Sequence, residues 1–300
     1  MGAHRIAFHA MAAENEIQVH GDEEAARRAA REAIAEVARI EAKYSRYRPG
    51  SVVSRINAGA GSAFEIDAET RGLLAYADAC FVQSGGLFDA TSGVLRRAWR
   101  FDEPRVPDDA QIAPLLRLVG WARVDLDGMR VRLPERGMEL DFGGFGKEYA
   151  VDRAAAVLRE AGVDSALVNL AGDLMVLGPQ PDGSAWRVGI RHPRREGALI
   201  ATLPVASGAL ATSGDYERFI EVDGVRHCHV LDPRTGRPAR GFQSVTVHAA
   251  SCLVAGSAST IAMLKGRDAG LAWLRSLGLP HFCVLGDGSV LDAFGPHDTA

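Results

Sequence analysis

The chain has 300 residues, of which 47% are hydrophobic and 24% charged, and its formal net charge at pH 7 is −4. These values are typical of a globular protein with one large domain or two closely packed ones. The acidic balance argues against sequence-independent nucleic-acid binding, which needs a basic surface. No apolar run reaches the roughly 18 residues that a transmembrane helix requires.

The N-terminal part of the sequence predicts one strand and two helices. Weak alternation of apolar residues indicates a strand over residues 6–20. Apolar residues at helical spacing predict an amphipathic helix over residues 23–44, with Asp22 as its N-cap. A second helix is expected over residues 68–84, and the glycine pair at residues 85–86 would end it.

The middle of the chain predicts a strand, a glycine-rich turn and a helix in succession. A short helix over residues 111–118 and a hairpin over residues 123–133 come first. A strand over residues 139–142 then leads into the turn, and helical spacing follows over residues 148–161. Such a unit leaves backbone N–H groups free at a helix N-terminus, where they can hold an anion.

The C-terminal half mixes strands and helices without strict alternation, so we expect an α+β fold with mixed sheets and flanking helices. One domain should span residues 1–300, with subdomains at roughly residues 1–135 and 136–300. The predicted strands cover residues 166–169, 174–177, 186–190, 199–205, 219–222 and 244–248, and the predicted helices cover residues 256–265 and 268–276.

Four polar turns built from small residues each follow an apolar run, which suggests one ligand site assembled from loops. They lie at residues 141–147, 169–173, 211–216 and 227–236. The last of these brings imidazole, carboxylate, guanidinium and hydroxyl groups into ten residues. Cys228 lies there between two histidines, but neighbouring side chains on a strand point to opposite faces, which argues against a catalytic thiol.

These segments, in this order, resemble the FAD:protein FMN transferases, the ApbE-type flavin transferases. Residues 141–152 resemble the family's D-L-G-G-I-A-K-G-Y-A-V-D, and residues 166–173 resemble A-L-V-N-L-G-G-D. Residues 211–216 match A-T-S-G-D-Y, and residues 229–238 resemble H-I-I-D-P-R-T-G-x-P. The resemblance implies a fold with FAD in a cleft between two subdomains. It also implies Mg²⁺-dependent transfer of FMN from FAD to a Ser or Thr hydroxyl of an acceptor flavoprotein, with release of AMP.

The resemblance assigns two catalytic residues and a set of FAD-binding residues. Lys147 would lie at the flavin nucleotide, and His229 at the diphosphate as a general base or transition-state stabiliser. The turns supply further binding candidates, and Met11, Tyr47 and Asp89 come from weaker motifs. For the polar candidates the alternative is a turn that fixes its own loop, and for the glycine turn it is a tight bend with positive φ. The remaining candidates are Gly143, Gly144, Asn169, Asp173, Ser213, Asp215, Asp232 and Thr235.

For the metal, the resemblance implies the backbone carbonyl of Gly146, the hydroxyl of Thr260 and an aspartate at the position of Gly256. That aspartate is absent here, and Glu148 stands where relatives mostly have glycine. Glu148 could replace the missing carboxylate, or it could be a helix-start residue favoured by the helix dipole. Waters or Ser257 could also complete the metal shell. The alternative functions are an FAD-binding protein and an FAD pyrophosphatase, both without transfer to a protein.

The N-terminus shows no long apolar signal segment and no lipobox cysteine, although many relatives of the family are exported lipoproteins. We therefore expect a cytoplasmic protein as the sequence stands, or a periplasmic one if a leader was removed.

Overall fold

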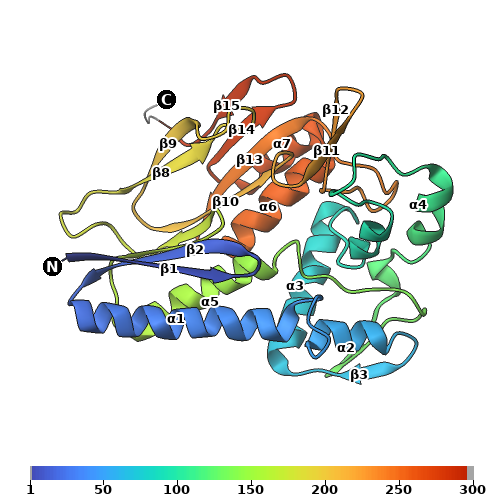
Figure 1. The fold of residues 1–300 in the computed structure, drawn as a ribbon, viewed down its shortest axis with the longest axis horizontal. Helices are drawn as coiled ribbons and strands as arrows, with labels where there is room; N and C mark the ends of the chain where they lie inside the picture. Colours follow the sequence, from blue (N-terminus) through green and yellow to red (C-terminus); the bar gives the residue numbers. More distant parts are fainter. Residues whose placement is uncertain (1, 296–300) are drawn as a thin grey trace.

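The computed structural model describes residues 2–295 and has an α+β fold, as predicted (Figure 1). Its main sheet has eight strands, and every neighbouring pair is antiparallel, so the expectation of a mixed sheet is wrong. Tight turns join several neighbours, and a hairpin must be antiparallel. The order is β1 (Gly2–Ala10), β2 (Ala13–Gly21), β6 (Ala166–Leu170), β7 (Asp173–Val176), β10 (Gly208–Gly214), β13 (Phe242–Ala249), β14 (His281–Leu285) and β15 (Val290–Asp292).

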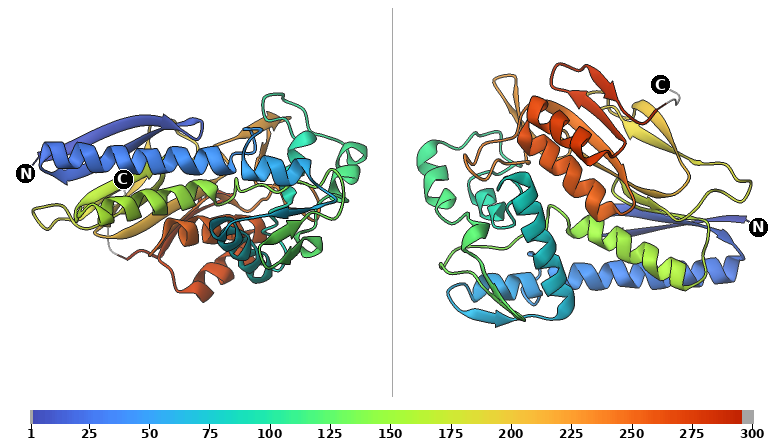
Figure 2. Two further views of the ribbon diagram at one scale, coloured as in Figure 1. Left: turned by 90° about the horizontal axis from the view of Figure 1, so that it is seen from below. Right: turned by 180° about the vertical axis from the view of Figure 1, so that it is seen from behind.

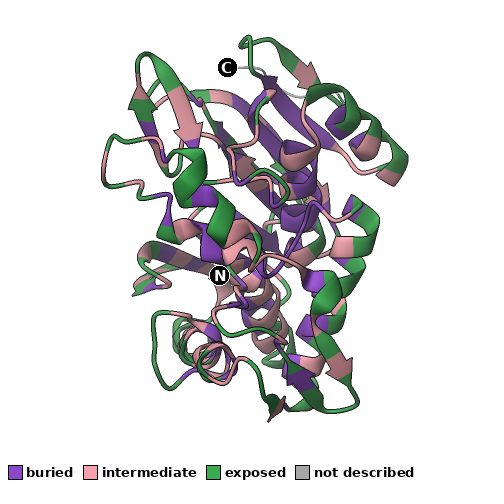
Figure 3. Ribbon diagram, turned by 90° about the vertical axis from the view of Figure 1, so that its right-hand side faces the viewer, coloured by how far each residue is buried: buried purple, intermediate pink, exposed green. Residues whose placement is uncertain are grey.

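Both faces of the central strands of this sheet are buried. Successive side chains of a strand point to opposite faces, so Val168 of β6 belongs to the main core and Leu167 to a second core. The hairpin of β8 (Trp186–Arg191) and β9 (Leu199–Val205) covers the second core with Trp186. Figure 3 shows the buried residues running through the centre of the molecule, while the outer loops are exposed.

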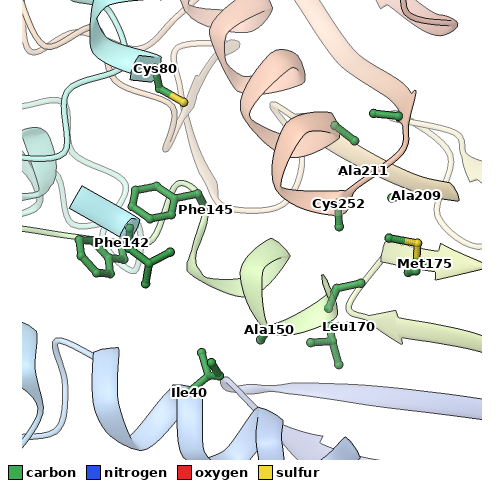
Figure 4. Close-up of a cluster of buried hydrophobic side chains, with 14 of the residues drawn as sticks. Ile40, Cys80, Phe142, Phe145, Ala150, Leu170, Met175, Ala209, Ala211 and Cys252 are labelled. Atoms are coloured by element: carbon green, nitrogen blue, oxygen red, sulfur yellow. The ribbon is translucent and has the colours of Figure 1, made fainter. Parts of the chain in front are cut away.

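Helices α1 (Glu23–Tyr44), α5 (Gly146–Glu160), α6 (Cys252–Lys265) and α7 (Arg267–Leu277) pack on the main core. Buried residues of α2 (Val52–Ala58) and α3 (Ala68–Ser84) belong to the same core. Helix α1 lies along α5, and α6 packs on β10 and β13 (Figure 2). Figure 4 shows Ala150 of α5, Cys252 of α6 and Leu170 of β6 in this core. The predicted bounds of α1 are confirmed, and the Asp22 carboxylate caps it by accepting from the backbone N–H of Ala25 at 3.1 Å.

A second lobe lies beside the sheet, at the right of Figure 1. Helix α3 ends at Gly85, which has a left-handed backbone as predicted. Because β1, β2 and α1 belong to the main sheet and its helices, the predicted division near residue 135 does not follow the sheet. The lobe contains α2 (Val52–Ala58), β3 (Ala63–Glu65), α3 (Ala68–Ser84), η1 (Ser92–Arg97), α4 (Asp109–Leu116), η2 (Trp121–Arg123), β4 (Asp125–Asp127) and β5 (Arg130–Arg132).

Two predicted strands differ from the structure. Residues 6–20 form a hairpin, with Met11 (φ 53°) and Ala12 (φ 60°) as a two-residue turn between β1 and β2. Such turns usually carry Asn or Gly, so the sequence holds no turn signal here. Residues 139–142 are not a strand, because their backbone bonds to the second lobe: Leu140 exchanges two hydrogen bonds with the Asn57 side chain.

The structure also contains strands that sequence patterns did not indicate. Strand β10 lies where a polar turn was expected at residues 211–216, and its small residues hide its alternation. Strand β11 (Phe219–Val222) was predicted, but its partner β12 (Val225–Cys228) was not. No helix in the described part of the chain is long and apolar enough to cross a membrane.

Candidate functional site

The glycine-rich segment before α5 is fixed by its contacts with the second lobe. One oxygen of Asp141 accepts from the backbone N–H of Gly143 at 2.8 Å, and the other pairs with Arg46. Gly143 and Gly144 do not have positive φ, so that expectation is wrong. Small size is what matters, because a Cβ at Gly144 would lie 3.1 Å from the ring of Phe88.

Helix α5 begins at Gly146, two residues before the predicted start, and within the described residues no side chain caps it. Its first turn presents Lys147 toward β7, where the Lys147 Nζ lies 2.7 Å from Oδ2 of the buried Asp173. Although desolvation opposes the effect, the negative charges of Asp173 and Glu148 raise the pKa of Lys147. Lys147 therefore stays charged, and its side chain remains 33% exposed, open to an anion.

Glu148 is the next residue of the same turn, and it is only 8% exposed. Its Oε2 has no hydrogen-bond partner within the part of the chain that is described. Burial, followed by the charge of Asp173, raises the pKa of Glu148. The carboxyl group lies against Gly256 of α6, since a Cβ built there would lie 2.7 Å from its Oε1.

A hydroxyl cluster joins β10 to α6 beside this carboxylate. The Ser213 Oγ lies 2.8 Å from the hydroxyl oxygens of both Ser259 and Thr260. The Ser259 hydroxyl also donates to the backbone carbonyl of Gly256 at 2.9 Å. Hydroxyl and carbonyl oxygens are ligands that Mg²⁺ accepts, so the predicted metal residues lie on elements that are in contact.

His229 follows the end of β12, and the backbone carbonyl of Arg218, next to β11, holds its ring. The ring Nδ1 lies 3.3 Å from the carbonyl oxygen of Arg218. Because a carbonyl can only accept, this contact assigns the proton to Nδ1 and leaves Nε2 unprotonated in the neutral ring. Desolvation lowers the pKa of His229, and the charges of Arg218 and Lys147 act in the same direction. His229 and Lys147 therefore lie within electrostatic range of each other.

Two predicted binding residues have their acceptor oxygens occupied by backbone N–H groups of the protein. Asp89 is buried, and its carboxylate accepts from the backbone N–H groups of Thr91 at 2.7 Å and Trp121 at 2.9 Å. Asn169 accepts from the backbone N–H of Gly172 at 2.8 Å. These contacts match the alternative of residues that fix their loops.

Three predicted residues near His229 in the sequence are also engaged with the protein. Asp215 accepts two hydrogen bonds from Arg194, at 2.7 and 2.6 Å. Asp232 accepts from the backbone and the guanidinium of Arg234. The Thr235 hydroxyl accepts from a backbone N–H two residues later at 3.2 Å. Asp232 and Thr235 therefore stabilise the turn after β12, whereas Asp215 ties the end of β10 to Arg194 in the β8–β9 connection.

Met11 and Tyr47, from the weaker motifs, differ in exposure. Met11 lies in the β1–β2 turn and packs partly on the main core. Tyr47 is 70% exposed, and its hydroxyl accepts from Arg46 at 2.7 Å. Although burial opposes it, hydrogen bonds from Arg46 and Arg218 lower the pKa of Tyr47. Arg218 thus interacts with Tyr47 of the loop after α1 through its side chain and with the His229 ring through its backbone carbonyl.

Sequence reasoning gave no role to two residues that build this site. Arg218 bridges Tyr47 and His229, as described above. The carboxylate of Asp152 accepts from the backbone N–H groups of Cys252 at 2.7 Å and Leu253 at 2.9 Å, which ties the start of α6 to α5. The available signal was an acidic residue among the apolar residues of a predicted helix.

Two surface depressions lie away from these residues, and the described residues hold no ready-made metal cluster. Shallow depressions on the second lobe, about 470 and 380 Å³, include Glu65 and Asn57 but none of the predicted site residues. Over residues 2–295, no group of three or more His, Cys, Asp and Glu side chains is arranged to hold a metal. A metal here would need carbonyl, hydroxyl and substrate oxygens besides one carboxylate.

Comparisons with known proteins agree on one family. The profile of the ApbE family matches residues 11–283. The FAD:protein FMN transferase of Rhodobacter capsulatus is 34% identical over 261 residues, which cover 84% of this chain and 50% of that protein. The protein of the same name from Vibrio cholerae is 30% identical over 254 residues, which cover 82% and 76%. The chain thus spans about half the length of the first of these relatives.

Solved structures extend the similarity to the whole fold. The ApbE protein from Thermotoga maritima superimposes with a TM-score of 0.90 at 32% identity, covering 97% of each chain. The flavinyl transferase ApbE of Pseudomonas stutzeri, in its apo form, gives a TM-score of 0.88 at 31% identity, covering 99% of this chain and 98% of that one.

Proposed function

This chain belongs to the ApbE family, and we propose that it transfers FMN from FAD to a Ser or Thr hydroxyl of an acceptor protein and releases AMP. The observation that carries the proposal is the ion pair between Lys147, in the first turn of α5, and the buried Asp173, which leaves a held and partly exposed cation at the start of the helix. Relatives named FAD:protein FMN transferases support the choice of substrate.

Lys147 and the uncapped start of α5 would bind the FAD diphosphate. An ammonium group binds phosphate as a point charge, and N–H groups at a helix N-terminus favour anions. Asp173 holds the Lys147 side chain in place before the substrate arrives. Tyr47, exposed beside Arg218, offers an aromatic face at the same site for the flavin ring.

His229 would take the proton of the acceptor hydroxyl. Its Nε2 carries a free lone pair in the neutral ring, because Nδ1 donates to the Arg218 carbonyl. As the hydroxyl oxygen forms its bond to the FMN phosphorus, the bond to the AMP phosphate breaks. The proton passes to Nε2, and AMP leaves with the electrons of the broken bond.

The residues present fit a divalent cation beside the diphosphate. Gly146 would offer its carbonyl, Thr260 its hydroxyl and Glu148 its carboxylate, whose Oε2 has no partner among the described residues. When bound, Mg²⁺ neutralises the charge that develops on the phosphates in the transition state.

A second candidate is hydrolysis of FAD to FMN and AMP at the same site. The solvent-exposed position of His229 favours it, because water could then replace the acceptor hydroxyl. FAD binding without any reaction is the third candidate, and the glycine at position 256 favours it.

The test is AMP release from FAD by the purified chain, with and without Mg²⁺. Each condition is repeated with and without a peptide that carries the Ser/Thr flavinylation motif of the family's acceptors. AMP that depends on both peptide and Mg²⁺, with FMN attached to the peptide, supports the transferase. AMP without peptide identifies the hydrolase, and bound FAD with no AMP in any condition rules out both reactions.

A further inference from the structure

The carboxyl group of Glu148 occupies the space that a side chain at position 256 would need. A Cβ built on Gly256 would lie 2.6 Å from the Glu148 Cγ, 2.7 Å from its Oε1 and 3.0 Å from its Cδ. The carboxyl carbon of an aspartate lies one bond beyond its Cβ. An aspartate at position 256 would therefore overlap the side chain of Glu148 and bring its carboxylate into the same region between α5 and α6.

We propose that Glu148 and Gly256 are a reciprocal pair, in which α5 supplies through Glu148 the one metal-binding carboxylate that residue 256 of α6 would otherwise supply. This inference rests on the metal dependence of the proposed function. Gly256 is then a requirement of the site, because any side chain there would displace Glu148.

The surroundings of Glu148 favour a bound cation. A buried carboxylate is costly unless it is paired or hydrogen-bonded. The charged groups that act on it are Lys147 and Asp152 of its own helix and Asp173 of β7, so two anions face one cation. Lys147 is already paired with Asp173. A divalent cation would supply the missing opposite charge.

The helix dipole alone does not explain this residue. First-turn carboxylates interact favourably with the dipole, and in this protein Glu23 of α1 and Asp268 of α7 occupy such positions while exposed to water. Glu148 has the same place in its helix but is buried against α6. Burial removes the solvation that makes the dipole interaction sufficient for the other two.

The oxygen atoms next to Gly256 suit the same role. Ser259 donates to the carbonyl of Gly256, and Ser213 links Ser259 to Thr260. Since Asp152 ties the first N–H groups of α6 to α5, the two helices hold position 256 and Glu148 in fixed relation. A carboxylate can thus reach one spot from either helix.

The first test measures Mn²⁺ binding, by the electron paramagnetic resonance signal of free Mn²⁺, with FAD present. The variants are Glu148→Gln, Glu148→Gly and the double variant Glu148→Gly/Gly256→Asp. Each single variant should weaken Mn²⁺ binding roughly 10–100-fold, and the double variant should restore it. Glu160→Gln, an exposed residue of the same helix, is the matched control and should leave binding unchanged. Unchanged Mn²⁺ affinity in Glu148→Gln would overturn the inference.

The second test needs neither metal nor activity. Gly256→Asp alone brings two side chains into one volume, so its thermal midpoint should fall on the order of 5 °C. Glu148→Gly should remove most of that fall when the two changes are combined. If the shifts in thermal midpoint of the two single variants simply add in the double variant, the side chains at positions 148 and 256 do not compete for one space, and the proposed pair is overturned. AMP release by the unmodified chain is scored separately, so loss of the proposed function and loss of this inference give different results.

Discussion

On the side of α5 that faces α1 and α3, carboxylates are paired with cations. Glu69 accepts from Arg39 at 2.6 Å, from Lys43 at 2.6 Å and from the hydroxyl of Tyr149 at 2.8 Å. On the side of the same helix that faces α6, Glu148 is more deeply buried and has an oxygen without a partner in the described chain. The same helix therefore contacts one carboxylate that is fully paired, Glu69, and carries another that is not, Glu148.

The difference separates stability from function. Hydrogen-bonded ion pairs at the α1–α3–α5 contact lower the pKa of Glu69, chiefly through Arg39, and so favour the folded chain. An unpaired buried carboxylate gives no such gain, and perturbed charges of this kind concentrate at functional sites. Changes on the first side should alter stability, whereas changes on the second should alter binding and transfer.

The largest effect is expected from His229→Ala. Loss of the general base should slow transfer roughly 10²–10⁴-fold, while FAD affinity and the thermal midpoint stay close to those of the unmodified chain. Single-turnover AMP release with the acceptor peptide measures the rate, and quenching of FAD fluorescence measures affinity. Turnover at the unmodified rate would remove His229 from the mechanism.

Lys147→Gln should come next, because it removes the charge that faces the diphosphate. A hydrogen bond to a charged group contributes about 1.5–3 kcal/mol, so FAD affinity should fall about 10–100-fold. Lys43→Gln is the matched control, since it removes a lysine from the satisfied side. Equal loss of FAD affinity in both variants would break the comparison between the two sides.

Glu69→Gln should lower stability by about 1–2 kcal/mol near neutral pH and leave transfer unchanged. Because the folded chain depresses the pKa of Glu69, its contribution is present above the ordinary pKa of about 4.3. The contribution disappears as the pH falls through the depressed value. Urea unfolding at several pH values should show the free energies of unfolding of the variant and the unmodified chain converging in acid. A difference that stays constant with pH would show that the ionised Glu69 is not its cause.

Cys228→Ala should have the smallest effect, although Cys228 is next to His229. Burial raises the pKa of Cys228 to about 11, so it is a neutral thiol at physiological pH. Its Sγ already has the carbonyls of Val230 and Ala239 as weak acceptors. Unchanged transfer would show that closeness to the site does not make a residue functional when its polar atoms already have partners in the protein. A strong loss would make the thiol part of the chemistry.

Local signals predicted the helices well because their causes are local. The bounds of α1 and α3 follow from apolar spacing and from carboxylates that cap their first turns. The prediction of a strand at residues 139–142 was wrong because the hydrogen-bond partners of this segment, Asn57 and Ala90, lie far away in the chain. A pattern of apolar residues indicates an extended backbone but not what that backbone bonds to.

The site was predictable to a similar degree. The motifs located Lys147 and Asp173, which the structure brings to 2.7 Å, and Ser213 and Thr260, which it brings to 2.8 Å. They could not show that the carboxylate of Asp89 would be taken up by its own lobe. Whether a side chain is already hydrogen-bonded within the protein depends on the tertiary fold, which the spacing of residues in the sequence does not show.

The shared volume at Glu148 and Gly256 also constrains how this lineage could have arisen. An ancestor with glycine and aspartate at these positions could not exchange them singly without an intermediate that has either no carboxylate or two in one space. On the proposed pairing, each substitution would be tolerated only together with the other. A survey that scores each position separately would classify this chain as degenerate, whereas one that scores the pair would count it among intact members.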